Sequence, residues 1–134
     1  MIMDVIKITT SKEFEVVDIT GKVREIVRKS GIENGIVVVF TRHTTTGIII
    51  NENESGLISD LEKTIEKLIP KGAGYTHDRI DNNAHSHLRA IILGSSVAIP
   101  VENGRLALGT WQSILFIELD GPRTREIYVK VCKC

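Results

Sequence analysis

Apolar and β-branched residues gather in short runs near both ends of the chain, and these runs predict strands. The run GIVVVF at 35–40 is apolar throughout, which is typical of a central strand covered on both faces, and 44–52 is its expected antiparallel neighbour. Asn103-Gly104 separates two apolar runs and predicts a tight hairpin, since both residues tolerate a positive φ. The predicted strands span 2–9, 13–19, 35–40, 44–52, 97–101, 105–119 and 125–132.

Two stretches between these strands repeat apolar residues at the spacing of a helix face. The first stretch predicts a helix over 21–30, with Thr20 as its N-cap and Gly31 as its end. The second predicts a longer helix over 54–69, which Pro70 ends because proline cannot continue the hydrogen-bond pattern.

A third, short helix is predicted over 86–93, after a glycine-rich polar stretch at 71–82 that has no apolar period. A loop of that length is uncommon in a compact domain and is often functional. Strands at both ends with helices between them predict a single α+β domain over 1–134. We expect a mostly antiparallel, sandwich-like β-sheet with two longer helices and one short helix.

The composition is that of an ordinary globular domain, with 42% apolar and 25% charged residues. Lys plus Arg and Asp plus Glu number 17 each, so no net field favours nucleic acid or an anionic membrane. No apolar run reaches the roughly 20 residues that span a bilayer, and the first residues do not read as a signal peptide. The only cysteines, Cys132 and Cys134, are too close together to staple a fold, which predicts a reduced, cytoplasmic protein.

Histidines are the first candidates for chemistry. His43 lies in the loop TRHTTTG, and His85 and His87 form an H-x-H at the start of the third helix. Residues two apart in a regular helix point in nearly opposite directions, which opposes a shared site. If Ser86 is the N-cap, His85 lies outside the helix and the two imidazoles are free to converge, as metal-chelating H-x-H pairs do.

The loop just before this helix adds His77, Asp78 and Asp81, giving three histidines and two aspartates within eleven residues. These ligand types are compatible with a divalent metal. The alternative is a solvated loop in which Asp and Asn side chains cap turns. The sequence leaves both interpretations open.

Three further polar clusters stand at the ends of predicted elements. In NENES, Asn53 or Ser55 is a candidate helix cap, whereas Asn51 and Glu52, at the exit of an apolar strand, are candidate site residues. In LGSSV at 93–97, glycine and two serines suggest a C-cap and turn, or a weak phosphate cradle. In DGPRTR, the side chains of Arg123 and Arg125 suit a phosphate or carboxylate, with solvated charge as the default.

The stretches HTTTGIIINENE and NAHSHLRAIILGSSVAIPVENGRLALGTWQSILFIELDGPRTR closely resemble the YjbQ family of secondary thiamine-phosphate synthases, over nearly the whole chain. The family pattern is a serine, spaced hydrophobic residues, a glycine, four residues and then Gly-Thr-Trp-Gln. The residues that match it are Ser96, Ile99, Gly104, Gly109, Thr110, Trp111, Gln112 and Ile114.

This resemblance implies a homotrimer of small α+β subunits with an accessory activity, the joining of a pyrimidine diphosphate to a thiazole phosphate. It implies catalytic roles for His43, Glu52, His87, Trp111 and Gln112, and substrate or phosphate binding by Asn51 and Thr110. Arg123 and Arg125 join them as phosphate-binding candidates because a guanidinium suits the charge of the leaving diphosphate. A divalent metal, zinc or magnesium, would take His43, His85 and His87 as ligands. The alternative is a trimer that binds a metal and a phosphorylated or other anionic metabolite without turning it over.

Overall fold

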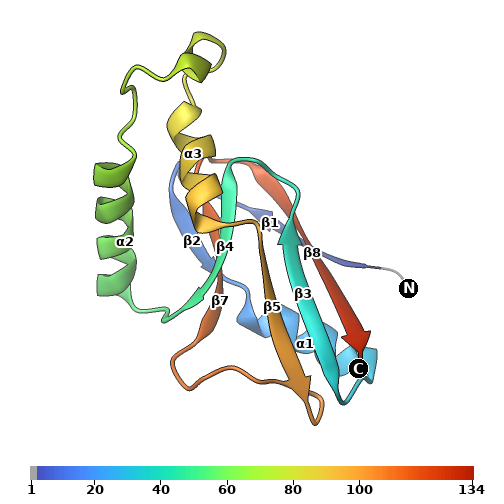
Figure 1. Cartoon of the computed structure of the whole chain (residues 1–134). Coiled ribbons are helices and arrows are strands. Elements are labelled where there is room, and N and C mark those ends of the chain that lie inside the picture. The colour runs from blue at the N-terminus through green and yellow to red at the C-terminus, as the bar shows by residue number, and fades with distance from the viewer. Residues whose placement is uncertain (1–2) are drawn as a thin grey trace.

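Two antiparallel sheets packed face to face form the body of the protein in a computed structural model that describes residues 3–134 (Figure 1). The first sheet, sheet A, contains in spatial order β1 (Asp4–Thr9), β8 (Thr124–Lys133), β3 (Gly35–Thr41), β5 (Ser96–Glu102) and β6 (Arg105–Leu106). The second, sheet B, contains β2 (Glu15–Asp18), β7 (Ser113–Glu118) and β4 (Thr46–Asn51). The helices are α1 (Thr20–Ser30), α2 (Ser55–Leu68), the 3₁₀ helix η1 (Thr76–Arg79) and α3 (Ala84–Leu93).

This architecture confirms the predicted α+β class, the antiparallel sandwich, and the two longer helices with one short helix. Every predicted strand region contains a strand, and residue 2, the first of the predicted strand 2–9, lies outside the described residues. None of the helices in the described chain has the length and apolarity that crossing a membrane requires.

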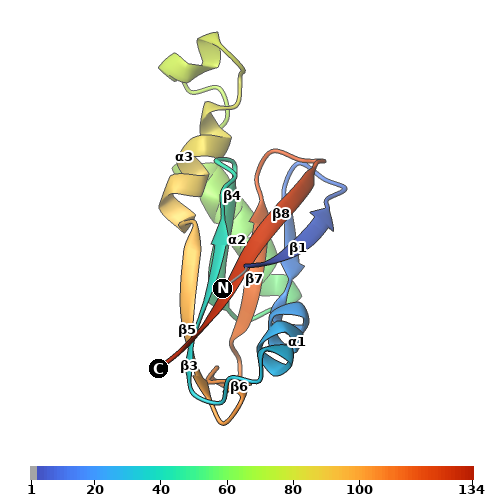
Figure 2. The same cartoon turned by 90° about the vertical axis from the view of Figure 1, so that its right-hand side faces the viewer.

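The main core lies between the two sheets and is closed at one end by α1 (Figure 2). Strand alternation produces it: Val37, Val39 and Ile127 point inward from sheet A, and Phe116 meets them from sheet B. A second, smaller cluster forms on the outer face of sheet B, where α2 and α3 cover Leu115, Ile117 and Leu119. The layers are therefore sheet A, core, sheet B and a pair of helices.

The predicted environment of 35–40 is wrong. β3 pairs with β5 and β8, whereas β4 pairs with β7 in the other sheet, so β3 and β4 are not neighbours. The outer face of β3 is also open, because Ile36, Val38 and Phe40 are 41%, 36% and 38% exposed. An apolar strand thus has one face in the core and one uncovered face within the single chain.

The predicted strand 105–119 is interrupted. β6 ends at Leu106, and β7 begins at Ser113, so the chain crosses from one sheet to the other between them. Gly109 to Gln112 forms a turn in which the amide of Gln112 donates to the carbonyl of Gly109 at 3.1 Å. The side-chain Oε1 of Gln112 accepts the amide of Gly109 at 2.9 Å, which closes the turn from the other side. The hairpin at Asn103-Gly104 is confirmed, with φ of 53° and 74°.

The ends of α1 and α2 follow the predicted positions to within a residue, but the capping side chains differ. Thr20 is the first residue of α1, and its amide donates a hydrogen bond to Asp18 Oδ1 at 2.9 Å. α2 is capped by Glu54, whose carboxylate accepts the amides of Gly56 and Leu57 at 2.6 and 2.9 Å, so neither Asn53 nor Ser55 is the cap. These hydrogen bonds to backbone amides lower the pKa of Glu54.

Candidate functional site

Helix α3 carries both histidines of the H-x-H and directs them into different cavities. The helix begins at Ala84, so both His85 and His87 lie inside it, and Ser86 is not its N-cap. Successive residues turn by about 100° around an α-helix, which puts residues two apart on opposite sides. His87 lines a cleft together with His43, whereas His85 lines a separate cavity between α2 and α3.

The cleft between α3 and the β3–β4 loop, called here the His43 cleft, has a volume of about 360 Å³. Its position depends on close packing of α3 against β4. The amide of Ile48 donates to the carbonyl of Gly94 at 3.1 Å, and a Cβ on Gly47 would lie 2.9 Å from that of Leu93. The residues that line the cleft are His43, Thr44, Thr46, His87, Ala90, Ile91, Gly94 and Ser95.

His43 is held as a neutral hydrogen-bond donor. Its Nε2 accepts the backbone amide of Glu126 at 3.0 Å, so the proton of the neutral imidazole lies on Nδ1. Burial, and next the positive charge of Arg125, lower the pKa of His43 below its ordinary value of 6.5. At neutral pH the ring therefore offers an Nδ1–H donor.

The other polar groups of the cleft add further hydrogen-bond donors. In the part of the chain that the structure describes, the hydroxyls of Thr44 and Ser95 and the imidazole of His87 form no hydrogen bond. Hydroxyls and an imidazole N–H are donors that bind an oxyanion without bringing a full charge into the cleft. The cleft suits a small phosphorylated or carboxylated molecule.

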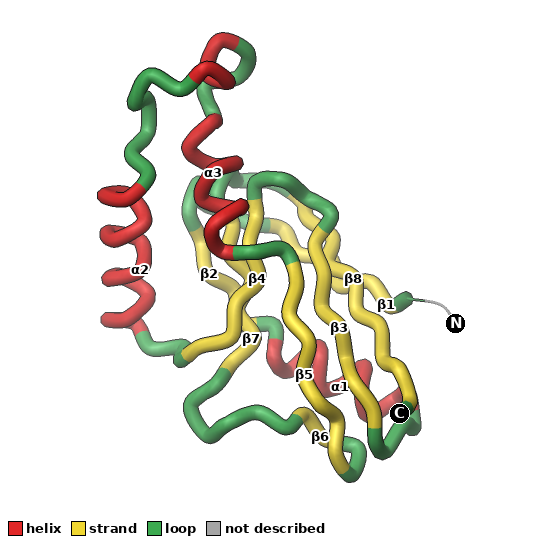
Figure 3. The backbone as a smooth tube through the Cα atoms, in the orientation of Figure 1, coloured by secondary structure: helices red, strands yellow, loops and turns green. Residues whose placement is uncertain are grey.

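His77 extends this arrangement from the loop between α2 and α3, which projects beyond the sheets (Figure 3). Its ring packs edge-on against that of His87, with 4.7 Å between centroids. Both rings line an adjoining cavity of about 380 Å³ with Tyr75. Asp78 instead caps α3, since its Oδ1 accepts the amide of Ala84 at 3.0 Å, as expected for a loop of capping residues.

The two candidate arginines differ in their availability. Arg125 is buried, and its guanidinium binds the Glu118 carboxylate and the hydroxyl of Thr45. Its role is therefore structural, and it is not available to a ligand. Arg123 is half exposed and donates to Asp120, so its charge is partly neutralised at the surface. Both charges act on His43, but Arg123 alone has access to solvent.

The remaining predicted site residues gather at the opposite end of sheet B. Asn51 pairs with Ser113, so the end of β4 lies beside the turn that contains Trp111 and Gln112. The six residues of β4 separate this end from the His43 cleft by roughly 17 Å. The predicted residues at this end are Asn51, Glu52, Thr110, Trp111 and Gln112.

Trp111 is 73% exposed on this far turn. Because β4 separates this turn from the His43 cleft, Trp111 cannot line that cleft in the same chain. The fold therefore divides the predicted site into two groups of residues that a single chain does not bring together.

The three histidines do not fit a metal site in a single chain. His85 lies on the opposite side of α3 from His87, and the Nδ1 of His43 carries a proton rather than a free lone pair. Among residues 3–134, no three His, Cys, Asp or Glu side chains are grouped so that they could hold a metal ion.

Several cleft residues were not predicted as site residues. Thr44 and Thr46 closely follow His43 in the chain, and the packing of α3 on β4 brings Ser95 to them; Ser95 belongs to the LGSSV stretch that the sequence offered only as a weak phosphate cradle. Arg89 was also missed, although a signal was present in the sequence. It follows His85 by four residues, the spacing that places two side chains on one helix face.

Comparison with known proteins gives one consistent result. A family model described as "UPF0047 protein YjbQ-like" matches residues 4–134. A UPF0047 protein of Archaeoglobus fulgidus is 54% identical over 121 residues, covering 90% of this chain and 94% of that protein. The UPF0047 protein YugU of Bacillus subtilis is 38% identical over 130 residues, covering 94% and 96%. A crystal structure of a YbjQ-like protein of unknown function from Sulfolobus solfataricus superimposes with a TM-score of 0.96 at 44% identity, covering 99% and 97%.

Proposed function

Because the chain belongs to the YjbQ-like UPF0047 family, we propose that it is a small-molecule protein whose His43 cleft binds a phosphorylated metabolite. The observation that carries this proposal is the fixed orientation of His43. The amide of Glu126 occupies Nε2, which leaves Nδ1–H as the donor that the His43 ring has free for a ligand. Around it stand hydroxyls and the imidazole of His87 with free hydrogen-bonding capacity in the described structure.

Substituting His43 or His87 by alanine is expected to weaken binding of the thiazole phosphate about 10- to 100-fold, because a hydrogen bond to a charged group contributes roughly 1.5–3 kcal/mol. Isothermal titration calorimetry measures this effect, with inorganic phosphate as a second probe. Thr64→Ala is the control, because Thr64 is exposed on α2 and lines neither cavity of α3.

The expected result is weaker binding of both probes by His43→Ala and His87→Ala, with wild-type affinity in Thr64→Ala. Unchanged affinity in both histidine variants would place the phosphate elsewhere and contradict the proposal.

A second candidate function is the reaction that the resemblance implies, formation of thiamine phosphate in a homotrimer. The exposure of Trp111 favours it, because the turn with Trp111 and Gln112 can meet a His43 cleft only on another copy of the chain. Each of three identical contacts would then join the cleft of one copy to the turn of the next, and a ring of such contacts closes.

The chemistry suits this division of residues. The C–O bond between the pyrimidinylmethyl carbon and the diphosphate breaks, the thiazole nitrogen forms a new C–N bond to that carbon, and diphosphate leaves. The donors of the His43 cleft would stabilise the charge of the leaving group. The face of Trp111 would stabilise positive charge on the pyrimidinylmethyl carbon.

Mixing two inactive variants tests the shared site. His87→Ala and Trp111→Ala are each expected to lose thiamine-phosphate formation, and a 1:1 mixture after subunit exchange should regain about a quarter of the wild-type activity. The reason is that an intact site needs a cleft from one copy and a turn from the next. Product formation and molar mass from light scattering are measured on the same samples.

Equal mixing of His87→Ala with His43→Ala is the matched control, since both changes lie in the same cleft and cannot complement each other. Recovery in the control, or none in the test mixture of trimers, would contradict a site shared between copies. Wild-type protein that is trimeric but forms no product would leave metabolite binding as the function.

A further inference from the structure

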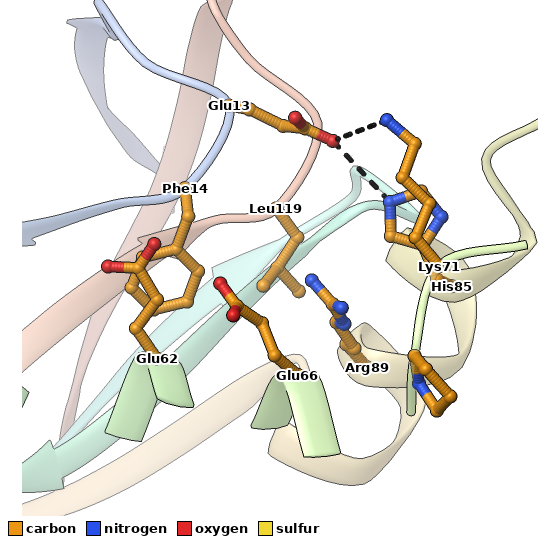
Figure 4. A pocket seen from close by; sticks show the side chains of 9 residues that line it. Glu13, Phe14, Glu62, Glu66, Lys71, His85, Arg89 and Leu119 are labelled. Carbon is orange, nitrogen blue, oxygen red and sulfur yellow. Dashed lines mark hydrogen bonds and ion pairs between the residues drawn. The ribbon is translucent and has the colours of Figure 1, made fainter. Parts of the chain in front are cut away.

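The second face of α3 lines a cavity of about 300 Å³ between α2, α3 and the β1–β2 turn, called here the α2–α3 cavity. It lies on the far side of α3 from the His43 cleft and is lined by a different set of residues. The residues that line it are Glu13, Phe14, Glu62, Glu66, Pro70, Lys71, His85, Arg89 and Leu119 (Figure 4). The proposed function does not use this cavity, and of its lining the family resemblance uses only His85, as a metal ligand.

Arg89 is a buried charge that lacks a counter-ion. The residue is only 8% exposed, and its Nε and Nη2 both donate to one backbone oxygen, that of Ile69, at 3.0 and 2.9 Å. The ion pairs in the described chain all involve other residues. Buried charges in proteins are paired, so a guanidinium with unused N–H donors in a cavity wall indicates a missing anionic partner, since no carboxylate of the described chain lies within ion-pair distance of it.

His85 provides a second, independent observation at the same cavity. The residue is 2% exposed, and its Nδ1 is buried with no hydrogen-bond partner in the described structure. Its Nε2 lies 3.4 Å from the carboxylate of Glu13, which also lies 3.5 Å from Lys71 Nζ (Figure 4). The carboxylate of Glu13 thus lies between Lys71 and His85 at the mouth of the cavity, and Arg89 is left as the guanidinium without such a partner.

We propose that the α2–α3 cavity is a binding site for a small zwitterionic metabolite that carries a carboxylate or phosphate and an amine. The oxyanion binds Arg89, and the apolar part of the ligand lies on Phe14 and Leu119. The amine binds the carboxylates of Glu62 and Glu66, which α2 presents on the opposite wall without an ion pair of their own in the described structure. A purely anionic ligand would face these two carboxylates unfavourably, so the lining selects for opposite charges on one molecule.

The two cavities are separated because His85 and Arg89 form one i, i+4 row of α3, whereas His87 and Ile91 form another. The backbone oxygen that Arg89 binds belongs to Ile69, the residue that follows α2. A ligand on Arg89 would therefore contact both helices that cover sheet B.

The test uses a series of ω-amino carboxylates, from glycine to 5-aminopentanoate, with butyrate and butylamine as probes of single charge. Inorganic phosphate and phosphoethanolamine distinguish a phosphate from a carboxylate ligand. Binding to the full chain is measured by saturation-transfer NMR and calorimetry. At least one zwitterion is expected to bind about tenfold or more tightly than the probe that lacks its amine.

Arg89→Met keeps the side-chain volume and should abolish binding, whereas Glu66→Gln should remove the preference for the amine and leave binding of the anion. Both are compared with Thr64→Ala, which should have no effect, because Thr64 is exposed on α2 and lines neither cavity. If Arg89→Met fails to fold, Lys71→Gln and Glu66→Gln test the proposal instead. Lys71 and Glu66, the latter on α2, are both exposed, so neither substitution disturbs the core.

Equal affinity for zwitterions and for single-charge anions would overturn the proposal, as would the absence of binding by every probe. A loss of unfolding free energy in Glu66→Gln without any effect on ligands would show that Glu66 is itself the counter-ion of Arg89, which also overturns it.

Discussion

Replacing Glu118 by alanine is expected to lower the free energy of unfolding by about 3–5 kcal/mol, the cost of leaving one partner of a buried ion pair alone. Glu118 is fully buried, and its carboxylate accepts Arg125 Nε at 2.8 Å, the hydroxyl of Thr10 at 2.8 Å and the amides of Leu119 and Asp120 at 3.0 Å. Without it, Arg125 remains a buried charge with the hydroxyl of Thr45 as its other side-chain partner. Chemical denaturation measures the loss.

The surface pair Glu25–Arg28 is the matched control, because it has similar geometry but both side chains are exposed. Glu25→Ala should leave the unfolding midpoint almost unchanged, since exposed ion pairs contribute little. Replacing both members, as Glu118→Leu with Arg125→Met, should cost less than Glu118→Ala alone, because no buried charge is then left unpaired. Equal stability of Glu118→Ala and Glu25→Ala would contradict this account.

The same pair sets a pH dependence of stability. Burial would raise the pKa of Glu118, but the hydrogen bonds from Arg125, Asp120 and Thr10, with the Arg125 charge, outweigh it and lower the pKa below the ordinary 4.5. A carboxyl with a lowered folded-state pKa contributes full stability above pH 4.5, and this contribution is lost as the pH falls from 4.5 through the folded value. Glu118→Ala should therefore show a weaker loss of stability below pH 4.5 than the wild-type protein.

Replacing Gly35 by alanine is expected to cost about 3 kcal/mol of unfolding free energy, at the upper end of overpacking changes. A Cβ at Gly35 would lie 2.0 Å from the carbonyl oxygen of Cys132 in β8, a distance that backbone atoms cannot accommodate without moving. The register Gly35↔Lys133 would have to open, and the last residues of β8 would separate from β3. Denaturation and hydrogen exchange at the amide of Cys134, which donates to Asn34, report this opening.

Gly21→Ala provides the control, because a Cβ there meets nothing within 4 Å and alanine is favoured over glycine in a helix by up to about 1 kcal/mol. We expect Gly21→Ala to be neutral or slightly stabilising. If both substitutions cost the same, the close approach of β3 and β8 at Gly35 would be refuted.

Local features were predicted well from the sequence, because they depend on neighbouring residues. Gly31 ends α1 with φ of 69°, Pro70 follows the end of α2, and Asn103-Gly104 forms its hairpin, since each reflects a backbone preference of the residue itself. The single Trp-containing turn was misjudged as strand because apolar residues on both sides hide the transition between sheets.

Pairing and direction could not be predicted in the same way. β1 and β2 are consecutive, yet β1 pairs with β8 and β2 with β7, and the β1–β8 contact joins residues more than a hundred positions apart. Likewise, α3 begins two residues before the predicted start at 86, and that small shift sends His85 and His87 to separate cavities. A strand pattern states which side chains share a face, but not which partner covers that face.

The sequence by itself therefore determined most of the elements, the ends of α1 and α2 to within a residue, and the family pattern around Gly-Thr-Trp-Gln, all of which rest on backbone preferences and periodicity within short windows. Only the tertiary structure decided that His43 meets His87 while Trp111 lies at the other end of sheet B, and that His85 joins Arg89 in a second cavity. The physical reason is that these meetings depend on long-range packing of two sheets and a helix pair, whose free energy is shared among residues distant in the chain.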